Sequence, residues 1–316
     1  HWPRYLCLTT DHPMHAGFTP GPALKDADVV LVVDSDVPWI PAIEEPATNT
    51  KVVQLGIDPL YGDYPMRTFA ADVVINAHPV NGISALHNAL ADRIDTKSAD
   101  IAARRKTSAA AHTERHATNA KALDDVKDAA PISPAWVTHC IDRIKGDNAI
   151  LVNESPLQQD HLTLSAPGSF FSASPVGGLG WGMGAALGLK LGAPDKLVIA
   201  ALGDGAYMFG NPTSAHFVSR ALGLPVLIVI FNNRMWGAVS RATKFMYPDG
   251  YAAKSNQVPL TLLQPAPALE MVVAASGGYG VIVDDPSKLE ADLAKARDIV
   301  LNECRQAVVN VITQGV

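Results

Sequence analysis

The sequence predicts an α/β fold made of two doubly wound parallel-sheet domains joined by a helical connector. Short apolar runs without polar alternation, such as residues 28–34 and 225–233, are typical of parallel strands covered on both faces. Helical patterns alternate with these runs, and such alternation favours a parallel sheet. The chain has 316 residues, which exceeds one typical core, so we expect two domains.

Composition excludes several classes of protein. The chain is 48% hydrophobic and 18% charged, which is enough apolar surface for a large core and excludes disorder as the main state. A net charge of −6 gives no reason to expect nucleic acid as a partner. No apolar run reaches the length of a membrane span, no secretory leader is recognisable, and the three cysteines lack CxxC spacing. We therefore expect a cytoplasmic protein with no membrane association.

Residues 1–95 are predicted to form a central α/β domain. Its strands are expected at residues 28–34, 51–58 and 71–77, and the proline-rich stretch between the first two excludes a helix there. The chain opens without Met or a helix start signal, so we expect this domain to be incomplete at its start. Residues 96–130, rich in Ala and charge, are predicted to be a solvated helical connector.

Residues 131–316 are predicted to form the second domain. An amphipathic helix is expected at residues 134–145, and the expected strands lie at residues 148–154, 196–204, 225–233 and 307–313. Pro212 and Gly223 indicate the start and the end of a further helix. Ser287 and Glu290 have the spacing of a capping box.

Polar residues follow two of these strands. Asp204, flanked by Gly203 and Gly205, leaves one strand, and Asn232 and Asn233 leave the next, about thirty residues later. If the strands are neighbours, a carboxylate and an amide oxygen face one point, and such hard oxygens suit Mg²⁺. Magnesium with few protein ligands takes up phosphate oxygens, and the free N–H groups of the helix starting near Asn211 favour an anion. Each motif alone is a common turn former, but the pair predicts a metal-bridged diphosphate.

These motifs resemble those of the thiamine-diphosphate-dependent enzymes, whose cofactor motif is GDG followed by NN. The segment PVGGLGWGMGAALGLKLGAPDKLVIAALGDG and the following NNRMWGAV are similar to the branch that contains benzoylformate decarboxylase and acetolactate synthase. The resemblance implies that residues 131–316 are the diphosphate-binding domain. It implies thiamine diphosphate and Mg²⁺ as cofactors.

The resemblance also assigns roles to individual residues. Asp204, the Asn233 side chain and the backbone oxygen of Met235 are expected to bind Mg²⁺. The cofactor is expected to lie against Gly205, Ala206, Trp236 and Gly237, and against Gly177, Gly178 and Leu179. The catalytic contributions fall to Gly177, whose carbonyl accepts from the pyrimidine amino group, and to Leu179, which holds the cofactor bent. Without the surrounding glycines, an ordinary core leucine would be the favoured interpretation of Leu179.

One part of the family's site is missing from this sequence. The family uses a glutamate from an N-terminal pyrimidine-binding domain of a neighbouring subunit, and nothing in residues 1–316 resembles that domain. Glu154, in an Asn-Glu pair, is not that glutamate. We therefore expect another chain or a missing domain to supply it, the complete protein to be a homodimer or homotetramer, and residues 1–316 alone to lack turnover.

The substrate is expected to be a small 2-oxo acid or a related carbonyl compound. Ile40 stands where aromatic 2-oxo acid decarboxylases carry a histidine, and His12 and His15 are the nearest alternatives, although loop histidines that serve local structure are the favoured interpretation. Trp236, Ala238, Ser240 and Arg241 are candidates to line the pocket. No glycine-rich dinucleotide turn occurs in residues 1–95, so FAD is not supported.

Three functions remain open on the sequence. The leading one is a 2-oxo acid decarboxylase or an acetolactate synthase-like carboligase, that is, a lyase or transferase. The second is a non-catalytic assembly or regulatory subunit that retains the fold, against which the intact Asp204 and Asn233 count. The third, a nucleotide-binding dehydrogenase, lacks the GxGxxG turn it would need.

Overall fold

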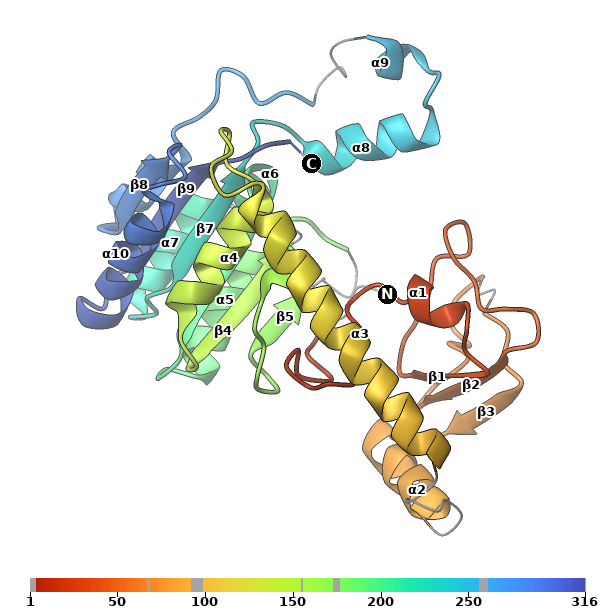
Figure 1. The fold of residues 1–316 in the computed structure, drawn as a ribbon. Helices are drawn as coiled ribbons and strands as arrows, with labels where there is room; N and C mark the ends of the chain where they lie inside the picture. The colour runs from red at the N-terminus through yellow and green to blue at the C-terminus, as the bar shows by residue number, and fades with distance from the viewer. Residues whose placement is uncertain are drawn as a thin grey trace. The chain divides into compact units, whose positions relative to one another are not determined.

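The chain divides into two compact units in the computed structural model, which describes residues 4–66, 69–91, 99–154, 156–172, 177–255 and 261–315. One unit is His1 with Pro13–Arg115, and the other is Trp2–His12 with His116–Val316. Parallel strands and helices make up both units (Figure 1), so the predicted α/β fold class is confirmed. The division falls inside the stretch 96–130 that the sequence predicts as connector, and the predicted domain limits stay a prediction.

The first unit is built on a three-stranded parallel sheet with the order β1-β2-β3. Its elements are α1 (Gly21–Leu24), β1 (Val29–Val33), β2 (Lys51–Gly56), β3 (Val73–Asn76) and α2 (Pro79–Ala91). All three strands fall in the predicted ranges. The stretch between β1 and β2 contains turns and no helix, as its prolines predict. A small core of Leu24, Val32, Trp39 and Val52 holds this unit together.

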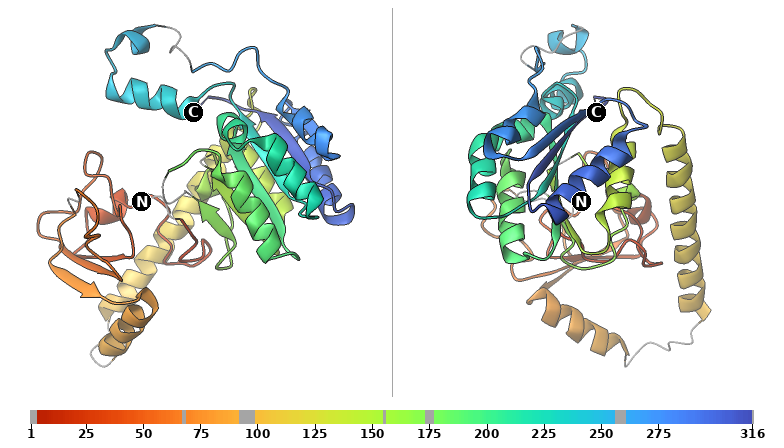
Figure 2. Two further views of the ribbon diagram at one scale, coloured as in Figure 1. Left: turned by 180° about the vertical axis from the view of Figure 1, so that it is seen from behind. Right: turned by 90° about the vertical axis from the view of Figure 1, so that its left-hand side faces the viewer.

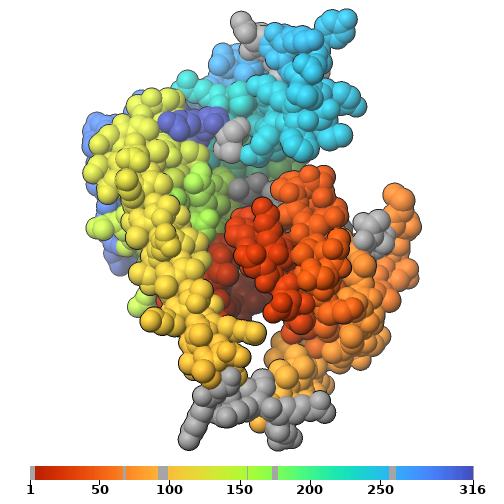
Figure 3. Space-filling model, turned by 45° about the vertical axis from the view of Figure 1, so that its right-hand side comes forward, coloured from red at the N-terminus to blue at the C-terminus, as the bar shows by residue number. Residues whose placement is uncertain are grey.

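Helix α3 (Ala99–Asp124) is a surface helix of 26 residues. Alanine favours the helical conformation and the charged residues keep it solvated, and Leu123 is its buried residue. Figure 3 shows the helix, coloured gold to yellow, exposed along its length. The predicted solvated helix is therefore present. No helix among the described residues is long and apolar enough to cross a membrane.

The second unit is built on a six-stranded parallel sheet with the order β5-β4-β6-β7-β9-β8. The strands are β4 (Ala149–Glu154), β5 (Phe170–Ser172), β6 (Leu197–Gly203), β7 (Leu227–Asn232), β8 (Tyr279–Val283) and β9 (Ala307–Ile312). Every residue of β4, β7 and β9 is buried, as expected for strands covered on both faces.

Helices cover both faces of this sheet (Figure 2). Helices α4 (Pro134–Lys145) and α10 (Leu289–Asn302) pack against each other on one face. The other face carries α5 (Trp181–Gly192), α7 (Pro212–Ala221) and the 3₁₀ segment η2 (Leu269–Ser276). Four short elements complete the unit: η1 (Gln159–His161), α6 (Asp204–Phe209), α8 (Gly237–Met246) and α9 (Tyr251–Lys254). The doubly wound arrangement is thus present.

The predicted capping box at the start of α10 is wrong. The helix begins after Lys288, and no side chain caps it. Ser287 instead donates its backbone N–H and its hydroxyl to Asp285 Oδ1, at 3.0 and 2.7 Å. The acidic residue before the serine therefore competes successfully for the hydroxyl, and the helix starts later than the capping pattern indicates.

The strand order places one point of the sheet where a ligand is expected. Strand β5 pairs on one side of β4, and β6, which follows α5 in the chain, pairs on the other side. The order of the chain therefore reverses between β4 and β6, and open α/β sheets bind ligands at the carboxyl ends of strands that flank such a reversal. Glu154 ends β4, and Asp204 directly follows β6.

Candidate cofactor site

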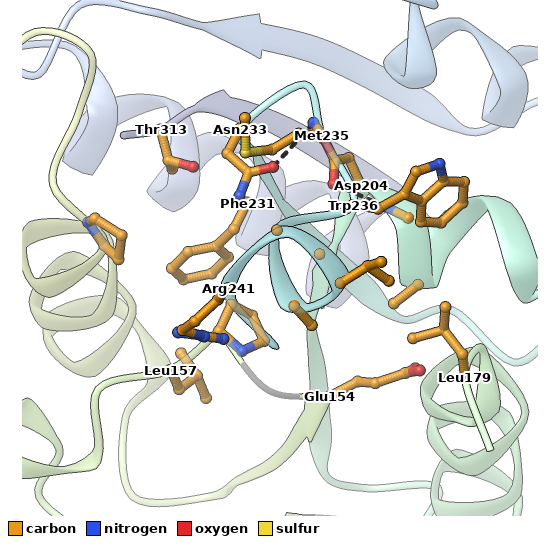
Figure 4. Close-up of a pocket in the computed structure, with 18 of the residues that line it drawn as sticks. Glu154, Leu157, Leu179, Asp204, Phe231, Asn233, Met235, Trp236, Arg241 and Thr313 are labelled. Carbon is orange, nitrogen blue, oxygen red and sulfur yellow. Dashed lines mark hydrogen bonds between the residues drawn. The ribbon is translucent and has the colours of Figure 1, made fainter. Parts of the chain in front are cut away.

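A cavity of about 240 Å³ opens at this edge of the second unit's sheet (Figure 4). The loops after β4, β6 and β7 supply most of its walls. Polar or glycine lining residues are Glu154, Gln158, Gly203, Asp204, Gly205, Asn233, Gly237, Arg241 and Thr313. Apolar ones are Pro134, Pro156, Leu157, Leu179, Ala206, Phe231, Met235, Trp236, Ala238 and Val239.

Asp204 is a buried carboxylate in the wall of this cavity. It follows β6 as the first residue of α6, and the residue is 3% exposed. Its Oδ1 accepts from the N–H of Gly205 at 2.8 Å, and its Oδ2 accepts from the N–H of Met235 at 3.2 Å. Burial raises the pKa of Asp204, and the backbone N–H groups around it oppose that shift.

Asn233 meets Asp204 from the neighbouring strand. Its Oδ1 accepts from the same Met235 N–H at 3.1 Å, so the two side chains converge on one donor. Figure 4 shows Asn233, Met235 and Asp204 gathered at one end of the cavity. The expected convergence of Asp204 and Asn233 is therefore present in the structure.

Asn232 has a different role from Asn233. It is the buried last residue of β7, its Nδ2 donates to Asn310 Oδ1 of β9 at 3.0 Å, and its Oδ1 accepts from the N–H of Arg234. Arg234 has a positive φ of 58°, which turns the chain so that Asn233 and Met235 face the cavity. One asparagine of the pair joins two strands, and the other faces the site.

The donor set is compatible with a divalent cation. A carboxylate oxygen and an amide oxygen lie around one N–H group, and the carbonyl of Met235 accepts from Gly237 N–H at 2.8 Å with a lone pair to spare. No lysine or arginine of the described residues forms an ion pair with Asp204. A buried carboxylate without a cationic partner, beside two further hard oxygens, is a suitable position for Mg²⁺.

Two glycines next to these ligands leave no room for a side chain. A Cβ atom on Gly205 would lie 2.3 Å from the Trp236 ring, and one on Gly237 would lie 2.8 Å from Asn233 Nδ2. The indole of Trp236 also meets the ring of Phe209 edge to face, with 5.2 Å between centroids. Gly205, Ala206, Trp236 and Gly237 all line the cavity.

The helix that follows the Gly203–Gly205 turn differs from the sequence expectation. Helix α6 begins at Asp204 itself, and α7 begins only at Pro212. Neither Asn211 nor Pro212 lines the cavity. Helix α7 therefore begins where the sequence predicts a helix, but the short helix α6 separates it from the turn, and the anion site expected there stays a prediction.

The glycine-rich segment before α5 brings only one of its predicted residues into the cavity wall. Leu179 lines the cavity and is 52% exposed, so it is not an ordinary core leucine. Gly177 has a positive φ of 66°, and both it and Gly178 are exposed without lining the cavity. Gly180 has a φ of 87°, and a Cβ there would lie 2.5 Å from the backbone nitrogen of Gly210.

Glu154 is the functional candidate whose role the sequence does not reveal. It is buried and lines the cavity, and it accepts from the N–H groups of Gly180 and Gly182, the latter at 2.8 Å. Burial raises the pKa of Glu154, and these N–H groups oppose the shift. Its position at the end of a strand, after an asparagine, is the only sequence signal for it.

The remaining candidates separate clearly. Ala238 and Arg241 line the cavity together with Trp236, whereas Ser240 is buried and does not. His12 and His15 are not among the lining residues. His15 is buried, its Nδ1 accepts from the N–H of Gly17, and its ring meets Phe18 edge to face. These contacts agree with the local structural role that the sequence favours for it.

The reversed strand order, the carboxylate and amide on one donor and the close glycines come together at one edge of the sheet, where open α/β sheets bind ligands. Residues 156–311 match the family model for the C-terminal TPP-binding domain of thiamine pyrophosphate enzymes. Residues 156–311 are therefore similar to this cofactor-binding domain, and the resemblance to the thiamine-diphosphate-dependent enzymes seen in the sequence is confirmed.

Known proteins similar to this chain come from several branches. An acetolactate synthase large subunit of Mycobacterium tuberculosis is 34% identical over 147 residues, 46% of this chain and 24% of the relative. A 2-hydroxyacyl-CoA lyase of Oryza sativa subsp. japonica is 25% identical over 320 residues, 95% of this chain and 51% of the relative. The chain therefore spans between a quarter and a half of the length of these relatives.

A solved structure shows the same fold. The thiamine diphosphate-dependent 4-hydroxybenzoylformate decarboxylase of Rhodococcus jostii RHA1 superposes with a TM-score of 0.73 at 22% identity. The superposition covers 99% of this chain and 55% of that chain. At this level of identity the likeness concerns the fold.

Proposed function

We propose that this chain binds thiamine diphosphate through Mg²⁺ and serves an enzyme that cleaves or forms a C–C bond next to the carbonyl of a small 2-oxo acid. The observation that supports this best is the shared Met235 N–H, which brings Asp204 and Asn233 to one point. When bound, thiamine diphosphate supplies carbanion stabilisation at a carbon next to a carbonyl. Relatives named synthase, lyase and decarboxylase support the assignment to reactions that make or break such a C–C bond. Whether a proton or a second carbonyl compound accepts the carbanion is to be decided by assay.

Each site residue has a defined task in this proposal. Asp204, Asn233 and the carbonyl of Met235 hold the cation. Gly205 and Gly237 would let the diphosphate approach their backbone, because glycine carries no side chain. Trp236 and Asn233 occupy the positions where a Cβ atom of these residues would lie. Gly177 would offer its carbonyl to the pyrimidine amino group, and Leu179, which lines the cavity, would contact the cofactor from the cavity wall.

The pyrimidine ring needs a carboxylate that this cavity does not offer. Glu154 and Asp204 are the acidic residues that line it, and backbone N–H groups hold both. The proposal therefore includes a glutamate from an N-terminal pyrimidine-binding domain of another subunit, within a cytoplasmic homodimer or homotetramer.

Calorimetric titration with thiamine diphosphate, with and without Mg²⁺, tests the cofactor assignment. We expect Mg²⁺-dependent binding by the wild type and a loss of at least about tenfold in affinity for D204N, which removes a charged ligand. The matched control is D285N. Asp285 is an exposed carboxylate that accepts from Ser287 and does not line the cavity, so D285N should bind thiamine diphosphate as the wild type does. Equal binding by D204N, or no binding by the wild type, would contradict the proposal and favour a non-catalytic subunit.

A further inference from the structure

Glu154 joins two loops of the site that are distant in sequence. We propose that it is a positioning residue. It fixes the Gly177–Gly180 segment next to the metal-binding turn, and this fixed position favours binding of the pyrimidine half of the cofactor. This inference rests on the function proposed above. It assigns a role to a carboxylate that neither binds the cation nor serves the pyrimidine ring.

The carboxylate acts as the N-terminal cap of α5. The residue at the cap position, Gly180, has no side chain that could do so. Glu154 reaches over from the end of β4, with one oxygen accepting from Gly180 N–H and the other from Gly182 N–H at 2.8 Å. A carboxylate at the N-terminus of a 12-residue helix also interacts favourably with the helix dipole. Both oxygens and the negative charge are thus engaged by one turn of backbone.

The fit around this cap is close. A Cβ atom on Gly182 would lie 2.8 Å from Glu154 Oε2 and 2.5 Å from the Leu202 side chain. Glu154 is buried, so water cannot replace a lost acceptor without rearrangement. The start of α5 is therefore fixed against the sheet by a contact that only an acceptor of this length supplies.

The same segment is also fixed to the metal-binding turn. Gly180 lies against the backbone of Gly210, where a Cβ would come within 2.5 Å of its nitrogen. Gly210 directly follows α6, the helix that begins with Asp204. Glu154, Gly180, Gly210 and α6 therefore form one continuous chain of contacts from the end of β4 to the metal ligand.

The position of Leu179 depends on these contacts of Glu154 and Gly180. Leu179 is the residue before Gly180, and it lines the cavity (Figure 4) although about half of its surface is exposed. The variant E154Q keeps the size of the side chain but turns one acceptor into an N–H₂ donor that faces a backbone N–H. We expect this change to release the Gly177–Gly180 segment while Asp204 and Asn233 keep their contacts.

The test compares two ligands that share only the diphosphate half of the site. Thiamine diphosphate and inorganic pyrophosphate, each with Mg²⁺, are titrated against the wild type, E154Q and E270Q. We expect E154Q to lower the affinity for thiamine diphosphate by at least about tenfold and to leave the affinity for pyrophosphate unchanged. The control E270Q changes a half-buried glutamate that accepts from Asn310 Nδ2 and lies outside the cavity, and both affinities should stay at the wild-type level.

Two results would overturn the inference. A parallel loss for both ligands would show general damage, and unchanged affinity for both would show that the cap does not reach the site. If the wild type binds no thiamine diphosphate, the proposed function fails, and hydrogen exchange then decides the role of Glu154. Faster exchange of the amides of Gly180 and Gly182 in E154Q supports the cap, and unchanged exchange refutes it.

Discussion

Met235 gives one backbone N–H to two side-chain oxygens, and this shared donor brings Asp204 and Asn233 together at the proposed metal position. Asp204 Oδ2 and Asn233 Oδ1 lie 3.2 and 3.1 Å from its nitrogen. Each oxygen accepts only part of one hydrogen bond there, so each keeps lone pairs for a cation. At the scale of single residues, the site is therefore arranged before any ligand arrives, which lowers the cost of binding.

Replacing Gly205 tests how tightly this end of the site is packed. In G205A the new methyl group would lie 2.3 Å from the Trp236 ring, so the indole must move. We expect a loss of roughly 1–3 kcal/mol in the free energy of unfolding, as for other overpacked positions, together with weaker cofactor binding. Thermal unfolding and calorimetric titration measure both effects.

The matched control is G184A. Gly184 is an exposed residue within helix α5, and no atom lies within 4 Å of the position that its Cβ would take. Alanine should stabilise that helix by up to about 1 kcal/mol. If G205A is as stable as the wild type, the indole does not pack against residue 205 as described.

A buried hydrogen-bond network connects the elements that follow the Gly203–Gly205 turn in the fold. Tyr207 of α6, His216 of α7 and Gln306 before β9 are linked by contacts of 2.7 Å on either side of the imidazole. Gln306 Nε2 donates to the carbonyl of His216, so its Oε1 faces Nδ1 and accepts from it. His216 Nε2 then accepts from the Tyr207 hydroxyl, and the neutral imidazole satisfies both neighbours.

This network predicts a pH dependence of stability. Burial lowers the pKa of His216, although the hydrogen bond to Gln306 opposes the shift. The unfolded chain binds a proton near pH 6.5 and the folded chain does so only at lower pH, so stability falls as pH drops below about 6.5, by at most about 1.4 kcal/mol per pH unit. Urea unfolding between pH 7.5 and 5.5 should show a shallower slope for H216Q than for the wild type. The variant H87Q changes an exposed histidine of α2 and should retain the wild-type slope.

The elements differ in how far the sequence could predict them. Strands β4, β6, β7 and β9 are nearly continuous apolar runs in the middle of the sheet, where burial on both faces produces an unmistakable pattern. The edge strands β5 and β8 were not predicted. Strand β5 has only three residues, and β8 alternates between half-buried and exposed positions, with only Val283 buried. Helix α6 was missed because its six residues are too short for a periodic pattern.

The site was predictable to a similar degree. Asp204 and Asn233 could be paired because both follow strong strand patterns. The cap formed by Glu154 could not, because it depends on the side-by-side placement of β4 and the start of α5, which no local pattern records. Contacts across the sheet, such as those of Gly180 with Gly210, appear only once the strands are placed.

At the scale of the whole molecule, the strand order concentrates chemistry at one edge. Residues from four separate parts of the chain, around positions 154, 179, 204 and 235, line a single cavity. They meet because β4, β6 and β7 are neighbours in the middle of the sheet and all run in one direction. The fold thus brings residues that are distant in the sequence together in one candidate site.

This arrangement predicts binding without turnover for residues 1–316. Of the lining carboxylates, Glu154 is engaged by two backbone N–H groups at the start of α5, and Asp204 is assigned to the cation in the proposed function, so we expect neither to serve the pyrimidine ring. We expect the isolated chain to bind thiamine diphosphate with Mg²⁺ but to release no CO₂ and form no acyloin from 2-oxo acids. Turnover by the purified chain alone would contradict this, and appearance of turnover on adding a pyrimidine-binding domain would support it.

The close approach of Gly180 to Gly210 has a consequence for how the protein can vary. Two positions thirty residues apart share a volume that holds backbone and nothing else. A larger residue at either one obliges the other loop to retreat, and that retreat pulls on the helix carrying Asp204. Evolution can therefore remodel the apolar wall of the cavity one residue at a time, but it must inherit these two loops as a pair.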